Sequence, residues 1–493
     1  MIPAAQSPVA ALLRGLAGAT PIETHISAVF VGPDAVLKLK KAVDLGFLDF
    51  TALDARERFA RRELEVNRRF APGLYRDVVP VTRRPDGTLE LAGTDGATVD
   101  WVLRMAPVPA ADFLDAATAH GGLAPALLDE AADSIAAMHD ALPSVRDGID
   151  PVASLAAPLE GTRRAALAAG LPAERVEDWA AAATAALAGI ASLLAARHAA
   201  GRVRRCHGDL HLKNLCLWEG RVTPFDALEF DEALATIDTG YDLAFLLMDL
   251  WRRLGRPAAN RVLNRYVART GDAGLVGGLP FWLSLRAAIR AHAEGGEAGL
   301  AYFALAEAAL RRPAAPPCLV AVGGLPGTGK SRLARALAPG LGAAPGALVL
   351  RSDEIRKRRQ GAAPEQRLPP EAYAPAENAA VFAELAALAG EALRSGRTVV
   401  ADAAFLRPEE RAAMEAAAAA AGAPFHGFWL RAPLDVLRGR VAARTGDASD
   451  ATVAVLEAAA ARDAGPIVWP PLDAASDPLP AARALLGLPP VVP

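Results

Sequence analysis

The stretch from Gly324 to Ser331, GLPGTGKS, has the residue types and spacing of a phosphate-binding loop. It fits G-x-x-x-x-G-K-[ST], follows the strand-like CLVAVGG and precedes the helix-like SRLARALA. Glycines let backbone N–H groups surround phosphate oxygens, and the helix N-terminus adds partial positive charge. In this pattern Lys330 bridges the β- and γ-phosphates and Ser331 holds Mg²⁺. The residues predicted to bind a nucleotide are Gly324, Leu325, Pro326, Gly327, Thr328, Gly329, Lys330 and Ser331.

Charged residues follow two strand-like segments of the same region. Asp353 and Arg356 lie in RSDEIRKR, and Asp402 ends TVVAD. The carboxyl ends of parallel strands form the ligand crevice of such sheets. Asp353 is therefore predicted to accept a hydroxyl proton and Arg356, one turn later, to hold a phosphate or the substrate. Asp402 is predicted to order Mg²⁺ through water.

The segment VLRGRVAARTGDASDA carries three arginines, Arg438, Arg440 and Arg444. Arginines at i and i+4 share one helix face, and such a helix can close over a transferring phosphoryl group. We predict this role for Arg440 and Arg444. A solvated face or surface salt bridges explain each arginine about equally well.

The order phosphate loop, Asp-x-x-Arg, strand-end Asp and arginine lid resembles the P-loop kinases of the polynucleotide-kinase, gluconate-kinase and zeta-toxin-like type. The resemblance covers residues 318 to 475 or thereabouts. Motor and AAA+ ATPases are disfavoured, because the sequence has no obvious sensor arginine.

A second set of residues that could carry out chemistry is HGDLHLKN, at 207 to 214. The interval from Asp209 to Asn214 equals that of the H-R-D-x-x-x-x-N catalytic loop of kinases. A hairpin, LCLWEGRVTPFDALEF, follows and is predicted to end its second strand at Asp226. In kinase chemistry Asp209 orients the acceptor hydroxyl and takes its proton, while Asn214 and Asp226 hold Mg²⁺.

A kinase of this type also needs a strand lysine for the α- and β-phosphates and a helix glutamate to pair with it. AVLKLKKAV supplies Lys38 and Lys40, which share a strand face because side chains alternate. The following helix supplies Glu63 and Glu65. We favour Lys38 with Glu63, and leave Lys40 and Glu65 as competitors.

Two further residues of this set are assigned to scaffolding. Asp242 is predicted to brace the backbone of the catalytic loop, and His207 to hold that loop in place. Acid–base or metal chemistry at His207 is the less favoured alternative.

Residues 20 to 310 resemble the aminoglycoside-phosphotransferase and choline-kinase branch of the protein-kinase-like fold. The whole chain resembles bacterial fusions of an aminoglycoside-phosphotransferase-family domain with a P-loop predicted kinase. ETHISAVF, LGFLDF, HGDLHLKNL, GLPGTGKS and RSDEIRKR carry the match. The chain departs from kinases where a glycine-rich loop is expected, since ETHISAVFVGPD stands there; backbone amides with Thr24 and Ser27 are predicted to cover the phosphates instead.

The elements that must position these residues fall into three regions with different predicted secondary structure. Residues 20 to 107 alternate strands and turns, with a PDG hairpin and a helix over TALDARERFARRELEVNRRFAP, capped by Thr51 or Asp54. Helical patterns dominate from 111 onward, interrupted at 202 to 230. After 318, the strands CLVAVGG, ALVLRSD, TVVADAAF and FHGFWLRA alternate with helices, which is typical of a parallel sheet covered on both faces.

We therefore predict an α/β multidomain protein. A bilobal protein-kinase-like α+β domain occupies residues 1–313, with a small lobe at about 20–107 and a helical large lobe at about 108–310. RRPAAPP, at 311 to 317, is the linker. A P-loop domain occupies 314–493.

Composition narrows the classes of function. The 493 residues are 52% hydrophobic and 22% charged, with a net charge of −3 and no basic block, which disfavours a dedicated nucleic-acid binder. Three cysteines without CxxC spacing argue against disulfides or zinc, and Cys206 and Cys216 are predicted to be core residues. No signal peptide or membrane span is expected, so we predict a cytoplasmic protein.

The leading hypothesis is a two-site kinase that uses ATP, with GTP left open, and Mg²⁺ to phosphorylate small-molecule hydroxyls, with Asp209 and Asp353 as bases. One alternative is a 5′-hydroxyl polynucleotide kinase in nucleic-acid repair. Another is an N-terminal ligand sensor that regulates the P-loop enzyme. The family resemblance implies the reaction but not the acceptor.

Overall fold

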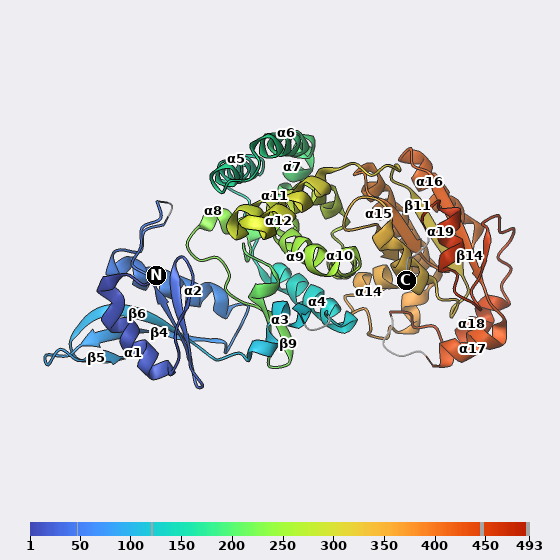
Figure 1. The fold of residues 1–493 in the computed structure, drawn as a ribbon. Coiled ribbons are helices and arrows are strands. Elements are labelled where there is room, and N and C mark those ends of the chain that lie inside the picture. The colour runs from blue at the N-terminus through green and yellow to red at the C-terminus, as the bar shows by residue number, and fades with distance from the viewer. Residues whose placement is uncertain (47, 120–121, 444–447, 490–493) are drawn as a thin grey trace. The chain divides into compact units, whose positions relative to one another are not determined.

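The computed structural model describes residues 1–46, 48–119, 122–443 and 448–489, which form two compact units (Figure 1). The first unit contains Met1–Glu130, Ala141–Val145 and Val203–Asp242, and the second contains Ala131–Asp140, Arg146–Arg202 and Leu243–Pro493. The second unit thus combines helices that precede residue 314 with the whole P-loop part. The domain limits predicted from the sequence stay a prediction about which segments fold together.

A six-stranded antiparallel sheet of order β1-β2-β3-β6-β4-β5 forms the centre of the first unit. Its strands are β1 (Ile22–Glu23), β2 (Ser27–Val31), β3 (Val36–Lys40), β4 (Tyr75–Arg83), β5 (Leu89–Leu91) and β6 (Ala97–Met105). The hairpin predicted at PDG is confirmed, because β4 and β5 pair in antiparallel register across it, Arg83 opposite Leu89.

Two helices bury apolar side chains against this sheet. α1 (Ser7–Ala17) packs Leu13 with the strand residues Leu37 and Leu39, and α2 (Leu53–Arg68) packs Ala60 with Val36. Because side chains alternate along β3, the two helices cover opposite faces of the sheet. The predicted helix is confirmed, but neither predicted cap is right. Ala52 is the N-cap residue and makes no side-chain cap hydrogen bond, while Asp49 accepts hydrogen bonds from Thr51 instead.

The remaining elements of the first unit hold the segment HGDLHLKN between two small ladders. The strand β7 (Val203–Arg205) pairs with β10 (Thr236–Asp238), and β8 (Leu215–Trp218) pairs with β9 (Arg221–Pro224). The predicted hairpin is therefore present, but its second strand ends at Pro224 rather than at Asp226. Two short helices complete the unit, α3 (Leu114–Ala119) and α8 (Glu232–Ala235). Cys206 and Cys216 are buried, as predicted.

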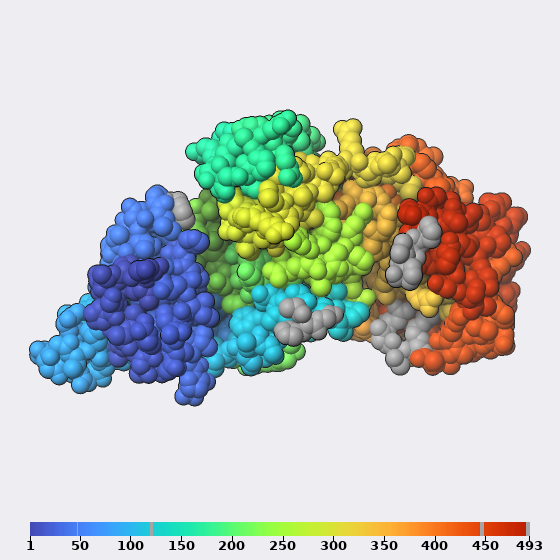
Figure 2. All heavy atoms as spheres, viewed as in Figure 1, coloured from blue at the N-terminus to red at the C-terminus, as the bar shows by residue number. Residues whose placement is uncertain are grey.

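Helices form the part of the second unit that precedes the P-loop. They are α5 (Ala153–Ala168), α6 (Ala173–Gly189), α7 (Ala191–Ala199), α10 (Arg256–Thr270), α11 (Leu279–Glu294) and α12 (Gly296–Leu310). Two longer helices, α4 (Pro125–Ala141) and α9 (Thr239–Leu254), have residues in both units. In Figure 2, residues of α5 and α6, coloured teal, are exposed on the visible face. Among the described residues no single helix is long and apolar enough to span a membrane, although α6 and α7, bent by 50°, pass that test as a pair.

A five-stranded parallel sheet of order β12-β13-β11-β14-β15 forms the rest of the second unit. Its strands are β11 (Leu319–Gly324), β12 (Leu348–Arg351), β13 (Val399–Asp402), β14 (Phe425–Arg431) and β15 (Pro471–Asp473). The first four strands were predicted from the sequence. β15 was not, because it is short and begins with proline.

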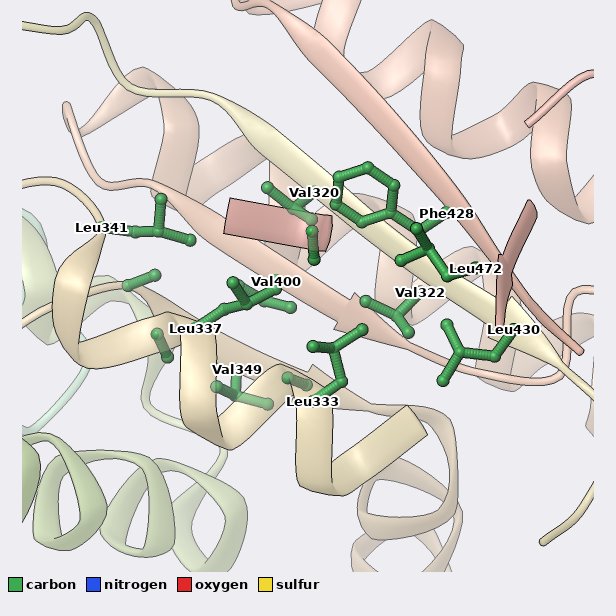
Figure 3. Packing of buried hydrophobic residues seen from close by; sticks show 14 of the residues in the cluster. Val320, Val322, Leu333, Leu337, Leu341, Val349, Val400, Phe428, Leu430 and Leu472 are labelled. Carbon is green, nitrogen blue, oxygen red and sulfur yellow. The ribbon is translucent and has the colours of Figure 1, made fainter. Parts of the chain in front are cut away.

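Helices cover both faces of this sheet, as the alternation of strands and helices predicted. The helices of this part of the unit are α13 (Lys330–Leu337), α14 (Ser352–Arg359), α15 (Pro375–Arg394), α16 (Pro408–Ala420), α17 (Leu434–Ala442), α18 (Val453–Ala460) and α19 (Leu479–Leu485). Figure 3 shows Leu333 and Leu337 of α13 packed against Val322 and Val400 of the strands. α15 and α16 contact the strands as well, and Met414 of α16 is buried.

The edge strand β12 is covered by α10 rather than by another strand. The backbone N–H of Val349 donates to Asn264 Oδ1 at 2.7 Å, and Asn260 Nδ2 donates to the carbonyl oxygen of Ala347 at 3.0 Å. Unpaired edge groups are costly when buried, and two asparagine side chains satisfy them here. The strand that leads into Asp353 is thereby fixed to the helical part of the same unit.

Candidate active sites

Two lysines of β3 meet one buried glutamate of α2 in the first unit. Lys38 Nζ lies 2.7 Å from Glu63 Oε1, and Lys40 Nζ lies 2.8 Å from Glu63 Oε2, with the Glu63 side chain 0% exposed. Glu65 instead pairs with surface arginines. The favoured pair Lys38–Glu63 is present, and Lys40 shares the same partner. Burial alone raises the pKa of Glu63, but the charges of Lys38 and Lys40 outweigh it and lower that pKa to about 2.

The same lysines reach the segment that follows the β8–β9 hairpin. Lys38 Nζ lies 2.6 Å from Asp226 Oδ1, and Lys40 Nζ lies 2.5 Å from Glu229 Oε1. Asp226 has a φ of 59°, which is uncommon for a residue with a Cβ. Its backbone N–H donates to the hydroxyl of Tyr75 at 2.9 Å, which fixes this strained turn. The cluster therefore joins β3, α2 and the residues from 226 to 229 around two ammonium groups.

The predicted catalytic-loop segment, HGDLHLKN, is held by the two scaffold residues predicted from the sequence. Asp242 accepts hydrogen bonds from the backbone N–H groups of His207, at 3.1 Å, and Gly208, at 2.9 Å. The Nε2 atom of His207 lies 2.8 Å from the carbonyl oxygen of Phe225, which ties the loop to the hairpin. Burial lowers the pKa of His207, so the neutral ring is favoured. Both scaffold assignments are supported by this geometry.

Asp209 and Asn214 lie at opposite ends of that loop and contact each other. Asn214 Nδ2 donates to Asp209 Oδ2 at 3.0 Å and to its carbonyl oxygen at 2.9 Å. Because the amide nitrogen is used in this way, the side-chain oxygen of Asn214 is the atom that suits a cation. Asp226 offers a carboxylate that is 42% exposed. Amide and carboxylate oxygens are the donors that Mg²⁺ prefers, so these residues fit the metal.

The expected glycine loop is replaced by a short turn between β1 and β2. Thr24 Oγ1 accepts from the backbone N–H of Ser27 at 3.0 Å and donates to its carbonyl oxygen at 3.3 Å. Lys41 Nζ donates to the carbonyl oxygen of Thr24. The Thr24 side chain thus stabilises the turn itself, and coverage of phosphates by this segment stays a prediction.

The predicted phosphate loop of the second unit has the shape that its glycines permit. Gly327 and Gly329 have φ values of 86° and 85°. A Cβ at Gly327 would lie 3.0 Å from the carbonyl oxygen of Leu437 in α17, whereas a Cβ at Gly329 meets no atom within 4 Å. Gly327 therefore allows α17 to pack against the loop, and Gly329 keeps its positive φ without strain. Lys330, the first residue of α13, donates from Nζ to the carbonyl oxygen of Leu325 at 3.0 Å.

Asp353 and Arg356 lie on α14, directly after β12. Burial raises the pKa of Asp353; the charges of Arg351, Lys330 and Arg356 act against this effect, and that of Asp402 adds to it. Arg356 is 5% exposed and donates to the carbonyl oxygen of Ala372 and to Asn378 Oδ1, both at 2.7 Å. Its guanidinium also lies over the ring of Tyr373, 4.7 Å from the centroid. Its Nε is buried without a hydrogen-bond partner among the described residues.

The predicted lid is described in part. Arg438 pairs with Glu457 at 3.0 Å, and Arg440 donates to the carbonyl oxygen of Ala474 at 2.7 Å. α17 ends at Ala442, and Arg444 lies outside the described residues, as does Phe47 of the LGFLDF segment. The lid roles of Arg440 and Arg444 stay predictions.

Sequence reasoning missed a second set of contacts around α14. Lys357 Nζ pairs with Asp450 Oδ2 at 2.7 Å, and the hydroxyl of Tyr373 donates to the same carboxylate at 2.6 Å. Asp450 follows the predicted lid and so connects that segment to the helix bearing Asp353. Arg351 was also missed: its guanidinium contacts Asp402, Glu354 and Ser331. Arg351 and Lys357 belong to the motif RSDEIRKR, which was the available signal.

Comparison with known proteins agrees with this two-part arrangement. A family model described as "Phosphotransferase enzyme family" matches residues 34–276, and one described as "AAA domain" matches residues 319–466. The Mycobacterium tuberculosis protein "Uncharacterized protein Rv2004c" is 30% identical over 465 residues, which are 90% of this chain and 89% of that protein. The chain belongs to the same family. This chain joins a phosphotransferase-family domain to a P-loop domain, as the resemblance implied.

Solved structures similar to the chain match its parts separately. A gluconokinase from Sinorhizobium meliloti is 24% identical, with a TM-score of 0.24, and the match covers 35% of this chain and 92% of that one. A choline/ethanolamine kinase family protein from Mesorhizobium loti is 16% identical, with a TM-score of 0.37, over 63% of this chain and 96% of that one. This Rv2004c-family chain has a kinase-like α/β part and a C-terminal parallel sheet with helices on both faces, and the predicted fold class is confirmed. The broad description "AAA domain" does not change the expected kinase type.

Proposed function

We propose that the chain is a bifunctional, ATP-dependent kinase that phosphorylates hydroxyl groups of small molecules at two sites. Its match to the phosphotransferase enzyme family, together with the P-loop domain, supports a phosphotransferase. The proposal adds the donor, the acceptor group and the independence of the sites. GTP stays open as donor, and a cytoplasmic location stays a prediction from the sequence.

At the N-terminal site Asp209 is the proposed base. Its carboxylate is 41% exposed, so an acceptor hydroxyl can approach it, and Asn214 Nδ2 orients one of its oxygens. The hydroxyl gives its proton to Asp209 as its oxygen bonds to the γ-phosphorus, and the bond to the β–γ bridging oxygen breaks to release ADP. Lys38 holds the α- and β-phosphates. Mg²⁺ bound by Asn214 and Asp226 supplies charge neutralisation on the phosphates.

At the C-terminal site Asp353 is the proposed base. A raised pKa favours proton capture, because a base works best when its pKa approaches the operating pH. Lys330 is proposed to bind the β- and γ-phosphates, and Arg356 to hold a phosphate or the acceptor. Ser331 and Asp402 are the proposed Mg²⁺ residues; their oxygens are suitable donors, although both accept hydrogen bonds from Arg351.

The single observation that carries the proposal is the cluster of Lys38, Glu63 and Asp226. These residues are far apart in the sequence, yet one ammonium group bridges both carboxylates. A purely structural core would rarely bury two lysines beside a half-exposed aspartate, because buried charges cost more than they return unless fully paired. A phosphate-binding lysine held by a helix glutamate explains the arrangement.

The test is a metabolite screen for transfer of labelled γ-phosphate, run on the wild type, Asp209→Asn and Asp353→Asn. Both substitutions preserve side-chain shape and remove the base. We expect each variant to lose one class of product and to keep the other. Loss of both products in one variant would argue against independent sites. Transfer to 5′-hydroxyl oligonucleotides by the wild type, lost in Asp353→Asn, would favour polynucleotide repair instead. Products that survive Asp209→Asn unchanged would favour a sensor role for the N-terminal part.

A further inference from the structure

The guanidinium of Arg351 lies between the two side chains proposed to carry the metal of the C-terminal site. Its Nε donates to Asp402 Oδ2 at 3.0 Å, and one terminal nitrogen donates to Ser331 Oγ at 2.9 Å. The other terminal nitrogen donates to Glu354 Oε1 at 2.8 Å. The side chain is 3% exposed. One planar cation therefore links α13, β13 and α14 next to the proposed phosphate-binding loop.

The position of Arg351 follows from the sheet. Arg351 is the last residue of β12 and is paired in parallel register with Asp402, the last residue of β13. Side chains of neighbouring strands in register point to the same side, so the arginine reaches over Asp402 toward the start of α13. A buried salt bridge that only fixes the strands would account for the bonds to Asp402 and Glu354. It would not account for the bond to Ser331, whose hydroxyl comes directly after the phosphate-loop lysine.

We propose that Arg351 is an internal cation that closes the metal position of the C-terminal site until a nucleotide is bound. This inference rests on the proposed nucleotide site around Lys330. While Ser331 Oγ accepts from a guanidinium, a divalent cation on the same oxygen is repelled by the neighbouring positive charge. A free cation is therefore excluded, and the metal enters together with the phosphates.

The arrangement of Lys330 agrees with this order of events. Its ammonium group donates to the carbonyl oxygen of Leu325, within the phosphate loop itself. A nucleotide brings negative phosphate oxygens that compete for Lys330 and balance the charge of an incoming metal. The Ser331 hydroxyl can then turn from Arg351 to the metal, while Arg351 keeps its two carboxylate partners.

Binding of Mn²⁺, which takes the same oxygen ligands as Mg²⁺, tests the proposal without any turnover. The free Mn²⁺ signal in electron paramagnetic resonance reports how much metal the full chain binds without ADP. With ADP, the Mn²⁺ bound by ADP alone is measured in a protein-free control and subtracted. All proteins carry Asp226→Asn to weaken the N-terminal cation site. The compared forms are the parent, Ser331→Ala, Arg351→Met and the double variant.

Without ADP, the parent and Ser331→Ala should bind the same amount of Mn²⁺. Arg351→Met should gain one site that the double variant loses, which separates metal binding at Ser331 from a general change of charge. With ADP, Ser331→Ala should weaken Mn²⁺ binding at least tenfold. If thermal melting shows Arg351→Met to be unfolded, the comparison of the parent with Ser331→Ala, with and without ADP, can still overturn the proposal.

Three results would overturn the proposed role of Arg351. The first is that the ADP-free parent binds Mn²⁺ at a site that Ser331→Ala removes. The second is that folded Arg351→Met gains no site, and the third is that Ser331→Ala has no effect on Mn²⁺ binding with ADP present. Failure of the underlying nucleotide site would look different, because ADP binding would then be unaffected by Lys330→Ala.

Discussion

Asn264 connects the helical part of the second unit to β12, the strand that leads into the proposed base Asp353, and its replacement by leucine should loosen that strand. Its Oδ1 accepts the backbone N–H of Val349, a residue 5% exposed. Leucine has similar size but no acceptor, so the N–H group stays buried and unpaired. Such a group costs about 1–3 kcal/mol. The carbonyl oxygen of Ala347 keeps its bond from Asn260, although Asn264→Leu also removes the bonds that Asn264 Nδ2 donates to Ala347 and Asn260.

Hydrogen–deuterium exchange of the Val349 amide measures this cost directly. Since each 1.4 kcal/mol is a factor of ten, exchange at Val349 should accelerate by about 5- to 150-fold. The amide of Val320 in the central strand β11 is the internal reference and should change little. Because β12 leads into Arg351 and Asp353, turnover at the C-terminal site should also fall while the N-terminal site is unaffected. Exchange at Val349 within twofold of the wild type would refute the idea that α10 holds this edge.

Two substitutions and one pH–rate profile probe the charged residues. Glu63→Gln should lower the free energy of unfolding by about 3–5 kcal/mol at neutral pH, because two buried lysines lose a shared partner. The ionised form of Glu63 stabilises the fold above its ordinary pKa of 4.5, and this contribution is lost as the pH falls toward about 2. Urea unfolding at several pH values should therefore show that the difference in free energy of unfolding between Glu63→Gln and wild type shrinks over that window. Lys40→Met should weaken nucleotide binding at the N-terminal site about tenfold, since Lys38 alone must then compensate Glu63; equal binding in Lys40→Met and wild type, by titration calorimetry on a Lys330→Ala background, would contradict the shared-partner account. Finally, the rate at the C-terminal site should rise with pH through a pKa above the ordinary aspartate value of 3.8, because burial raises the pKa of Asp353 and only the carboxylate is a base. If the acid limb of the pH–rate profile has a pKa at or below 3.8, Asp353 is not the base.

Periodicity and motifs predicted the elements and the residue types of both sites, whereas partners across the sheet could not be predicted. The two-residue period placed Lys38 and Lys40 on one face, but only the packing of α2 shows that both reach Glu63. Arg351 could not be assigned, because a charged residue at a strand end usually faces solvent. Its partner Asp402 is set by the order β12-β13, which no local pattern contains.

Local capping was the weakest of the sequence predictions. Thr51 and Asp54 have the side chains that favour an N-cap, yet the helix begins after Ala52. Asp49 accepts hydrogen bonds from the N–H and the hydroxyl of Thr51 in a turn before the helix, so the cap signal belonged to the preceding loop.

The short strand β15 was missed because its sequence also carries no clear local signal. Three residues beginning with proline carry no strand period, and the strand exists because β14 offers an edge.

The central claim is that one chain holds two separate nucleotide sites, and the binding stoichiometry of a non-hydrolysable ATP analogue with Mg²⁺ tests it most directly. Titration calorimetry on the full chain should give two sites for the wild type, one for Lys330→Ala, one for Lys38→Met and none for the double variant. A single site in the wild type that Lys330→Ala abolishes would contradict the account, because the kinase-like part would then bind no nucleotide.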